Sequence, residues 1–212
     1  MIKTIIFDFD GVIVDTENKK FTDLKILLKQ QDYVLKKEYF SDMIGKKTDV
    51  FILEKFPNIK KNILKKIISE RRKEQNKNID KYKLIKGIKK LLNYLKSKNI
   101  KIGLTTGSKK QFVLKILEKN KLESFFDVYV TGEDFKSSKP NPECFKLTLK
   151  KLNASPKKTI IVEDSNAGIQ AAKKTNAFVF GVNTYKNLNS KIINNLFDNH
   201  LDILKYLEKN KR

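Results

Sequence analysis

Short apolar runs recur along the chain and predict the strands of one buried sheet. Each run has the length of a strand and lacks the polar alternation of a strand that faces water on one side. Strands covered on both faces, as in a parallel sheet flanked by helices, have this continuous apolar composition. The runs occupy residues 5–7, 100–104, 128–130, 160–162 and 178–182.

Amphipathic patterns separate these runs and predict helices. Apolar residues recur at spacings of three and four, which places them on one face of a helix. Strands and helices that alternate in this way are typical of an α/β fold, so we expect a core built on a Rossmann-like parallel sheet. The clearest helical patterns lie in residues 88–95, 112–117 and 145–152.

The first and second expected strands are separated by about 90 residues, far more than a single crossover connection needs. Within this gap, apolar positions follow helical spacing at residues 21–28 and 63–68, and no segment predicts a strand. We therefore expect a small helical cap domain at residues 16–83. It would be inserted into an α/β catalytic core formed by residues 1–15 and 84–212.

The high positive charge of the chain does not change the expected fold. The 212 residues carry a formal net charge of +22, and 43 of the 46 basic residues are lysines spread over the expected helices. Proteins that read base edges favour arginine, which can make paired hydrogen bonds. We therefore attribute the lysine excess to compositional bias and expect no specific nucleic-acid partner.

Few residues are available for disulfide, zinc or membrane functions. The chain contains one cysteine, Cys144, and one histidine, His200, too few for an internal disulfide or a structural zinc site. Asp8 and Asp10 interrupt the apolar start, and no run reaches the roughly 18 residues of a membrane span. We expect a monomeric cytoplasmic protein with no membrane partner, a buried Cys144 and a His200 that is a surface or helix-capping residue.

Polar and small residues follow three of the expected strands directly. They are Asp8, Asp10 and Gly11 after the first strand, residues 105–108 after the second, and Glu163 and Asp164 after the fourth. In open parallel sheets, ligands bind in the crevice beyond the carboxyl ends of the strands. The sequence therefore predicts one functional site at that edge.

Four segments around these positions form a recognisable set. They read DFDGVIVDT at residues 8–16, TG at 106–107, KPNP at 139–142 and EDSNAGI at 163–169. In this order and at this spacing, the chain resembles the haloacid dehalogenase-like hydrolase superfamily. It is most similar to the subgroup that carries a helical cap after the first strand. That subgroup includes beta-phosphoglucomutases and phosphoglycolate phosphatase-like enzymes.

The resemblance implies a Mg²⁺-dependent phosphatase that acts on a small phosphorylated metabolite through an aspartyl-phosphate. It implies that Asp8 is the nucleophile and that Asp10 is the general acid and base. Lys139 would neutralise negative charge on Asp8 and on the phosphoryl oxygens. Thr106, Gly107 and Ser108 would bind the phosphoryl group, although Ser108 is also a candidate helix N-cap.

The resemblance also implies a metal site and a substrate-contacting loop. Mg²⁺ prefers oxygen ligands, often one or two carboxylates together with substrate phosphate. The implied ligands are the Asp8 carboxylate, the Asp10 backbone carbonyl and Asp164, with Glu163 in a supporting position. In the cap, Lys46 and Lys47 are expected to contact the leaving group of the substrate.

Three other functions remain to be weighed. Asp10 argues against a dehalogenase, because a halide leaves without needing a proton. A sugar-phosphate mutase of the family would have a cap histidine and a cap arginine, whereas Lys20 stands near the histidine position and no arginine precedes Arg71. This mutase is the alternative to the phosphatase. A catalytically idle phosphate- or polyanion-binding protein is less favoured, because the chemical residues of the motifs are all present.

Overall fold

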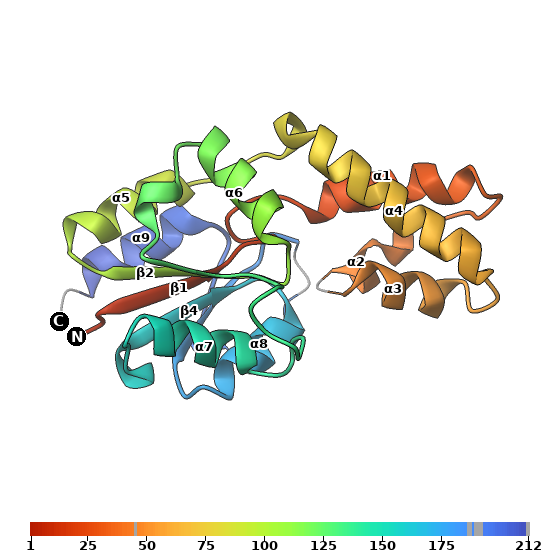
Figure 1. Cartoon of the computed structure of the whole chain (residues 1–212). Coiled ribbons are helices and arrows are strands. Elements are labelled where there is room, and N and C mark those ends of the chain that lie inside the picture. Colours follow the sequence, from red (N-terminus) through yellow and green to blue (C-terminus); the bar gives the residue numbers. More distant parts are fainter. Residues whose placement is uncertain (45, 186–187, 189–192, 211–212) are drawn as a thin grey trace. The chain divides into compact units, whose positions relative to one another are not determined.

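The computed structural model describes residues 1–44, 46–185, 188 and 193–210 (Figure 1). The chain divides into two compact units. The core unit comprises Met1–Val14 and Leu84–Arg212, and the inserted unit is Asp15–Lys83. Each unit has a hydrophobic cluster of its own. Gly45, which falls in the expected cap loop, lies outside the described residues.

The core unit is built on a six-stranded parallel sheet. The strand order is β3-β2-β1-β4-β5-β6, as expected for a Rossmann-like α/β core. All five apolar runs form strands, because both faces of the sheet are covered. The strands are β1 (Thr4–Asp8), β2 (Lys101–Thr105), β3 (Val128–Val130), β4 (Thr159–Glu163), β5 (Phe178–Val182) and β6 (Asn195–Phe197).

The pattern of apolar residues did not reveal β6. This strand has three residues and lies at the sheet edge, where Leu196 is 39% exposed. An edge strand has a neighbour on one side only, so it needs no continuous apolar run. Its place in the sheet is decided by pairing with β5.

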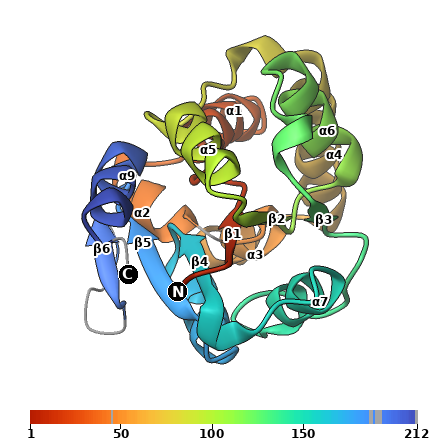
Figure 2. The same cartoon turned by 90° about the vertical axis from the view of Figure 1, so that its left-hand side faces the viewer.

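Helices cover both faces of this sheet (Figures 1 and 2). Helices α5, α6 and α9 lie on one face, and α7 and α8 lie on the other. Helix α8 was not among the helical patterns of the sequence, because small residues such as Ala171 and Ala172 form much of its buried face. The helices are α5 (Ile88–Ser97), α6 (Lys110–Lys119), α7 (Glu143–Lys151), α8 (Asn166–Lys173) and α9 (His200–Lys209).

The parallel register aligns the carboxyl ends of the central strands. Asp8 at the end of β1 pairs with Thr105 at the end of β2. On the other side of β1, Phe7 pairs with Val162, one residue before the end of β4. Side chains that follow β1, β2 and β4 are therefore brought to one edge of the sheet.

The inserted unit is helical, and its described residues include no strand of three or more residues. Its core contains Leu24, Leu28, Phe51, Ile52 and Ile67, all at most 1% exposed. Its role as a cap remains a prediction. The helices are α1 (Glu17–Lys29), α2 (Phe40–Met43), α3 (Thr48–Lys55) and α4 (Lys61–Lys77), with short 3₁₀ turns at Lys37–Tyr39 and Ile79–Lys81.

Within the described residues, no helix has both the length and the apolar composition required to cross a membrane. Cys144 is fully buried in the core unit, as expected, and burial raises the pKa of its thiol to about 11. The cysteine is therefore a protonated packing residue at neutral pH.

The expectation that His200 is a surface or capping residue is wrong, because its side chain is fully buried and the N-cap of α9 is Asn199. Nε2 lies 2.6 Å from the carbonyl oxygen of Val12, so Nε2 carries the hydrogen and donates it. Nδ1 has no hydrogen-bond partner among the described residues. Burial lowers the pKa of this imidazole to about 4, although the bond to Val12 opposes the shift.

This pKa predicts a loss of stability in mild acid. The pKa of His200 is about 4 in the folded chain against an ordinary 6.5, so the unfolded chain takes up the proton first as the pH falls. The contribution is present in full above pH 6.5 and is lost on the way down to pH 4. Between pH 7 and 4.5 the loss amounts to about 2 kcal/mol.

Urea unfolding of the wild type and of His200→Gln, in which residue 200 cannot titrate, would measure this loss of stability at both pH values. We expect the wild type to lose about 2 kcal/mol more than the variant. Equal losses would show that the histidine does not change its protonation on unfolding.

Candidate active site at the carboxyl edge of the sheet

Three buried carboxylates meet where β1 and β4 end. Asp8 is the last residue of β1, Glu163 is the last residue of β4, and Asp164 follows it. Their exposed fractions are 4%, 0% and 3%. One oxygen from each lies within 4.8 Å of the others. The structure thus brings together side chains that are about 155 residues apart in the chain, as the parallel register requires.

A tight turn after β1 places Asp10 beside this group. Gly11 has a φ of +81°, a left-handed conformation that glycine adopts readily. A Cβ atom at this position would overlap the Asp164 carboxylate. The Gly11 N–H donates to the Val14 carbonyl at 2.8 Å and closes the turn. Glycine is therefore required here both by its backbone conformation and by the close approach of Asp164.

Lys139 brings positive charge to the buried carboxylates. Its ammonium donates to Asp8 at 2.5 Å and also contacts Glu163. Burial acts to lower the pKa of Lys139, but the Asp8 and Glu163 carboxylates outweigh it and hold that pKa well above its ordinary value. The lysine is therefore charged, and this partly buried cation joins the ends of β1 and β4.

Both carboxylate oxygens of Glu163 have hydrogen-bond partners. One carboxylate oxygen contacts Lys139. The other accepts hydrogen bonds from the backbone N–H groups of Asp164 and Ser165, at 3.0 and 3.1 Å, and from the Ser165 hydroxyl at 3.0 Å. Both Glu163 oxygens are therefore occupied by protein donors, and its supporting position at a metal remains a prediction.

The site has more negative than positive charge. Burial raises the pKa of Asp8 well above its usual range, and the Lys139 ammonium opposes the shift. Asp8, Asp10, Glu163 and Asp164 face a single lysine in this group of residues. A carboxylate-rich, oxygen-only donor set of this kind fits Mg²⁺, which is hard and prefers oxygen ligands. The residues present therefore fit the metal that the motifs imply.

Two hydroxyl groups reach the Asp10 carboxylate from the loop after β2. Thr106 Oγ1 and Ser108 Oγ donate to the same Asp10 oxygen, at 2.7 and 2.8 Å. The Ser108 N–H donates to Thr106 Oγ1 at 2.9 Å and closes the loop. A Cβ atom on Gly107 would meet no atom within 4 Å, so the space beside its backbone is open. The expected phosphate-binding residues are thus gathered around Asp10.

The two cap lysines belong to the inserted unit, and their expected contact with the substrate remains a prediction. Lys46 forms an ion pair with Glu54, and its carbonyl oxygen accepts a hydrogen bond from Lys20 at 2.9 Å. The Lys20 ammonium also contacts Glu17. Lys47 precedes α3 and has no ion pair with the described residues. Lys47 is therefore the freer of the two ammonium groups.

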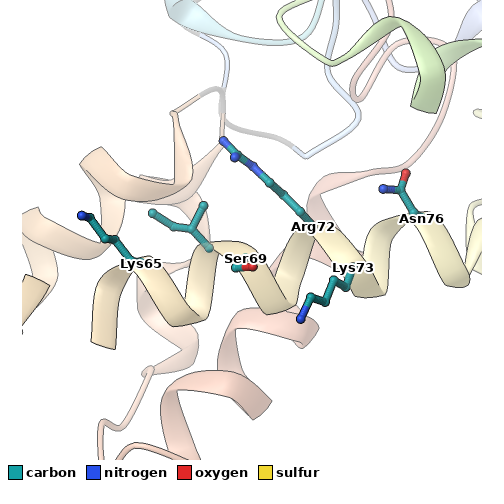
Figure 3. A pocket seen from close by; sticks show the side chains of 6 residues that line it. Lys65, Ser69, Arg72, Lys73 and Asn76 are labelled. Carbon is teal, nitrogen blue, oxygen red and sulfur yellow. The ribbon is translucent and has the colours of Figure 1, made fainter. Parts of the chain in front are cut away.

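Sequence reasoning missed a cationic groove along α4 (Figure 3). The hollow has a volume of about 350 Å³ and contains three cationic side chains and no carboxylate. In Figure 3, Arg72 and Asn76 extend from the same side of the helix. The signal available in the sequence was the helical spacing of these polar residues. The lining residues are Lys65, Ile68, Ser69, Arg72, Lys73 and Asn76.

Sequence reasoning also missed two residues that contact the turn after β1. The Thr184 hydroxyl donates to the Gly11 carbonyl at 2.9 Å, and His200 donates to the Val12 carbonyl. Neither residue lies in a motif, and no local pattern marks them. Both are brought to the turn by segments that follow β5 and β6 in the chain.

Comparisons with known proteins identify relatives that cover most of the chain. A family model described as haloacid dehalogenase-like hydrolase matches residues 5–182. A phosphorylated carbohydrates phosphatase from Thermotoga maritima is 32% identical over 176 residues, covering 81% of each chain. A phosphoglycolate phosphatase from Aquifex aeolicus is 29% identical over 98% of this chain and 97% of its own.

A solved structure is also similar along nearly the whole chain. The crystal structure of a beta-phosphoglucomutase from Clostridium difficile superposes with a TM-score of 0.84 at 29% identity. The match covers 99% of this chain and 96% of the other. These likenesses bear out both the fold and the family that the four motifs indicated.

The contact between Gly168 and Glu163 gives a stability prediction. A Cβ atom on Gly168, in the first turn of α8, would overlap the Glu163 carboxylate. Alanine favours a helix interior by about 1 kcal/mol over glycine, but overpacking typically costs about 1–3 kcal/mol. We expect Gly168→Ala to lower the free energy of unfolding by up to about 2 kcal/mol net.

Urea unfolding would measure this change. Gln170→Ala, at an exposed position on the same helix, is the matched control and should stay within about 0.5 kcal/mol of the wild type. A Gly168→Ala variant more stable than the wild type would show that the carboxylate has room to move.

Proposed function

The chain belongs to the haloacid dehalogenase-like hydrolase family, and we propose that it is a Mg²⁺-dependent phosphatase of a small phosphorylated metabolite. Its phosphatase relatives support hydrolysis of phosphoric monoesters as the class of reaction. The observation that carries the proposal is the contact of Lys139 with Asp8 at 2.5 Å, beside a second acid, Asp10, at the carboxyl edge of the sheet.

In the first step, we assign Asp8 as the nucleophile. A carboxylate oxygen of Asp8 forms a bond to phosphorus while the bond from phosphorus to the ester oxygen breaks. Asp10 gives its proton to the departing oxygen, so an alcohol leaves and an aspartyl-phosphate remains. The covalent intermediate divides one difficult displacement into two easier ones.

In the second step, Asp10 acts in the opposite direction. Its carboxylate, now without the proton, removes a proton from a water molecule as the water oxygen attacks phosphorus. The bond from phosphorus to Asp8 breaks, inorganic phosphate leaves, and both aspartates return to their starting forms. The same two side chains thus serve both steps.

The residues around these aspartates bind and orient the phosphoryl group in our proposal. Lys139 is a fixed, charged donor beside Asp8, suited to the negative charge that builds up on the phosphoryl oxygens. The Gly107 backbone borders open space. We propose that its N–H, with the hydroxyls of Thr106 and Ser108, binds the phosphoryl oxygens.

Mg²⁺ would be held by the Asp8 carboxylate, the Asp10 backbone carbonyl and Asp164, with Glu163 supporting Lys139 and the loop. When bound, the ion supplies positive charge that offsets repulsion between the phosphoryl group and the aspartates. Asp164 approaches the turn closely enough to exclude any side chain at position 11. This close approach supports a shared role for the turn and Asp164.

We propose that residues 16–83, which lie in the inserted unit, act as a cap domain that selects the substrate. Within it, Lys46 and Lys47 are proposed to contact the leaving group. The ion pair of Lys46 with Glu54 makes Lys47 the stronger candidate. We expect the enzyme to be a cytoplasmic monomer without a specific nucleic-acid or membrane partner.

A sugar-phosphate mutase remains the second candidate because of the likeness to a beta-phosphoglucomutase structure. A mutase must also hold a second phosphate, and no arginine precedes Arg71 to bind it from the expected cap region. Lys20, near the position of the expected mutase histidine, is engaged by Glu17 and the Lys46 carbonyl. An ammonium held in this way is a poor substitute for an imidazole, which favours the phosphatase.

Replacement of the nucleophile tests the proposal directly. Asp8→Asn keeps the volume of the side chain but removes the attacking carboxylate, so hydrolysis of p-nitrophenyl phosphate should fall below about 1% of the wild-type rate. Asp32→Asn, at an exposed turn, is the control and should keep full activity. Residual turnover above this level in a folded Asp8→Asn protein would contradict the assignment.

Removal of the metal gives an independent prediction. Because the site has more carboxylates than cations, EDTA should reduce hydrolysis of p-nitrophenyl phosphate at least about 100-fold, and excess Mg²⁺ should restore it. Asp164→Asn should raise the Mg²⁺ concentration needed for half-maximal activity. An unchanged rate in the chelator would exclude the proposed metal-dependent reaction.

A further inference from the structure

We propose that His200 is a positioning residue, whose buried imidazole holds the turn that carries Asp10. This inference rests on the proposed function, because it concerns the group that would protonate the leaving alcohol. It adds the single histidine of the chain, which lies outside all four motifs, to the residues that determine the geometry of the reaction.

The turn after β1 is held from three directions. Three consecutive carbonyl oxygens each accept one hydrogen bond from a distant segment. Gly11 accepts from the Thr184 hydroxyl at 2.9 Å, Val12 accepts from His200 Nε2 at 2.6 Å, and Ile13 accepts from the Ile85 N–H at 3.0 Å. These bonds fix the backbone just beyond Asp10.

His200 is placed rigidly enough to act as such a support. Its side chain is fully buried, and its ring packs edge-on against Phe7 of β1 with the ring centroids 6.1 Å apart. A Cβ atom on Gly87 would overlap Leu201, so the first turn of α9 is packed tightly against the chain at residues 86–87. The imidazole therefore has little freedom to move away from Val12.

The choice of histidine is not explained by packing alone. The ring leaves Nδ1 buried without a hydrogen-bond partner among the described residues, and a buried polar atom without a partner destabilises a fold. An apolar side chain would avoid this cost. What histidine provides instead is a rigid N–H donor at the Val12 carbonyl, two residues beyond Asp10.

The position of Asp10 follows from this support. On one side its carboxylate accepts hydrogen bonds from Thr106 and Ser108. On the other, its backbone continues directly into the turn anchored at Val12 by His200. A displacement of about 1 Å in a catalytic group can reduce a rate about 100-fold. Loss of the His200 donor should therefore impair proton transfer by Asp10 and have less effect on attack by Asp8.

Two aryl phosphates separate these effects. The p-nitrophenolate ion leaves readily without a proton, whereas the phenolate of phenyl phosphate is a poorer leaving group and depends more on general acid catalysis. We expect His200→Met, which has no donor, to reduce kcat/KM for phenyl phosphate about tenfold more than for p-nitrophenyl phosphate. His200→Gln, of nearly the same shape but with an amide donor, should restore most of the difference.

Ile203→Val provides the packing control. Ile203 is fully buried on the same helix, so this variant should change stability without altering the ratio between the two substrates. If His200→Met does not fold, His200→Asn can replace it, because its amide is too short to reach Val12. We then expect the same larger loss of kcat/KM for phenyl phosphate than for p-nitrophenyl phosphate.

Equal losses on both substrates in a folded donor-free variant would overturn the inference and leave a purely structural histidine. A wild-type protein that hydrolyses neither ester would instead refute the proposed phosphatase. The two failures are therefore distinguishable.

Discussion

The buried contact of one ammonium with two carboxylates is the interaction on which the rest of the site depends. Lys139 bridges Asp8 and Glu163 at the ends of two adjacent strands. Without it, two nearly unexposed carboxylates would face each other with no counter-charge, which is strongly unfavourable in a protein interior. The same contact leaves Asp8 beside a fixed positive charge, where a phosphoryl group can be received. Stability of the sheet edge and the proposed chemistry thus draw on one set of charges.

Two features of the fold make this interaction possible. One is the parallel register of the strands, and the other is glycine at two positions where a carboxylate lies against the backbone. Parallel pairing ends β1, β2 and β4 at the same edge. There, Gly11 makes room for Asp164, and Gly168 makes room for Glu163. Side chains at these two positions would push a carboxylate out of the cluster. The turn between β1 and the inserted unit is then held by donors from the last third of the chain, including His200.

In our proposal the core unit performs the phosphoryl transfer and the inserted unit selects the substrate. The core unit contains the motif residues, and its likeness to phosphatases and to a beta-phosphoglucomutase reflects machinery common to a family. The residues that we propose to select the substrate belong to the inserted unit, where Lys46 is paired with Glu54. The lysines therefore differ in what they contact. Lys139 contacts Asp8 and Glu163, and Lys65 and Lys73 line the α4 groove.

The amino-acid pattern alone was enough to predict the five principal strands and to find the four motifs. Continuous apolar runs are a local property, and a buried parallel strand needs nothing else to be recognised. The motifs were equally local, because each lies within nine or fewer consecutive residues. Only the tertiary structure placed β6, whose short edge strand depends on pairing with β5. It alone showed Ser108 on Asp10, Lys46 on Glu54 and His200 buried against Val12. The contacts of Ser108 and His200 join residues that are distant in sequence, and no periodicity near one partner indicates the other. Lys46 and Glu54 are eight residues apart, but Lys46 precedes α3 and Glu54 lies within it, so no helical spacing relates them.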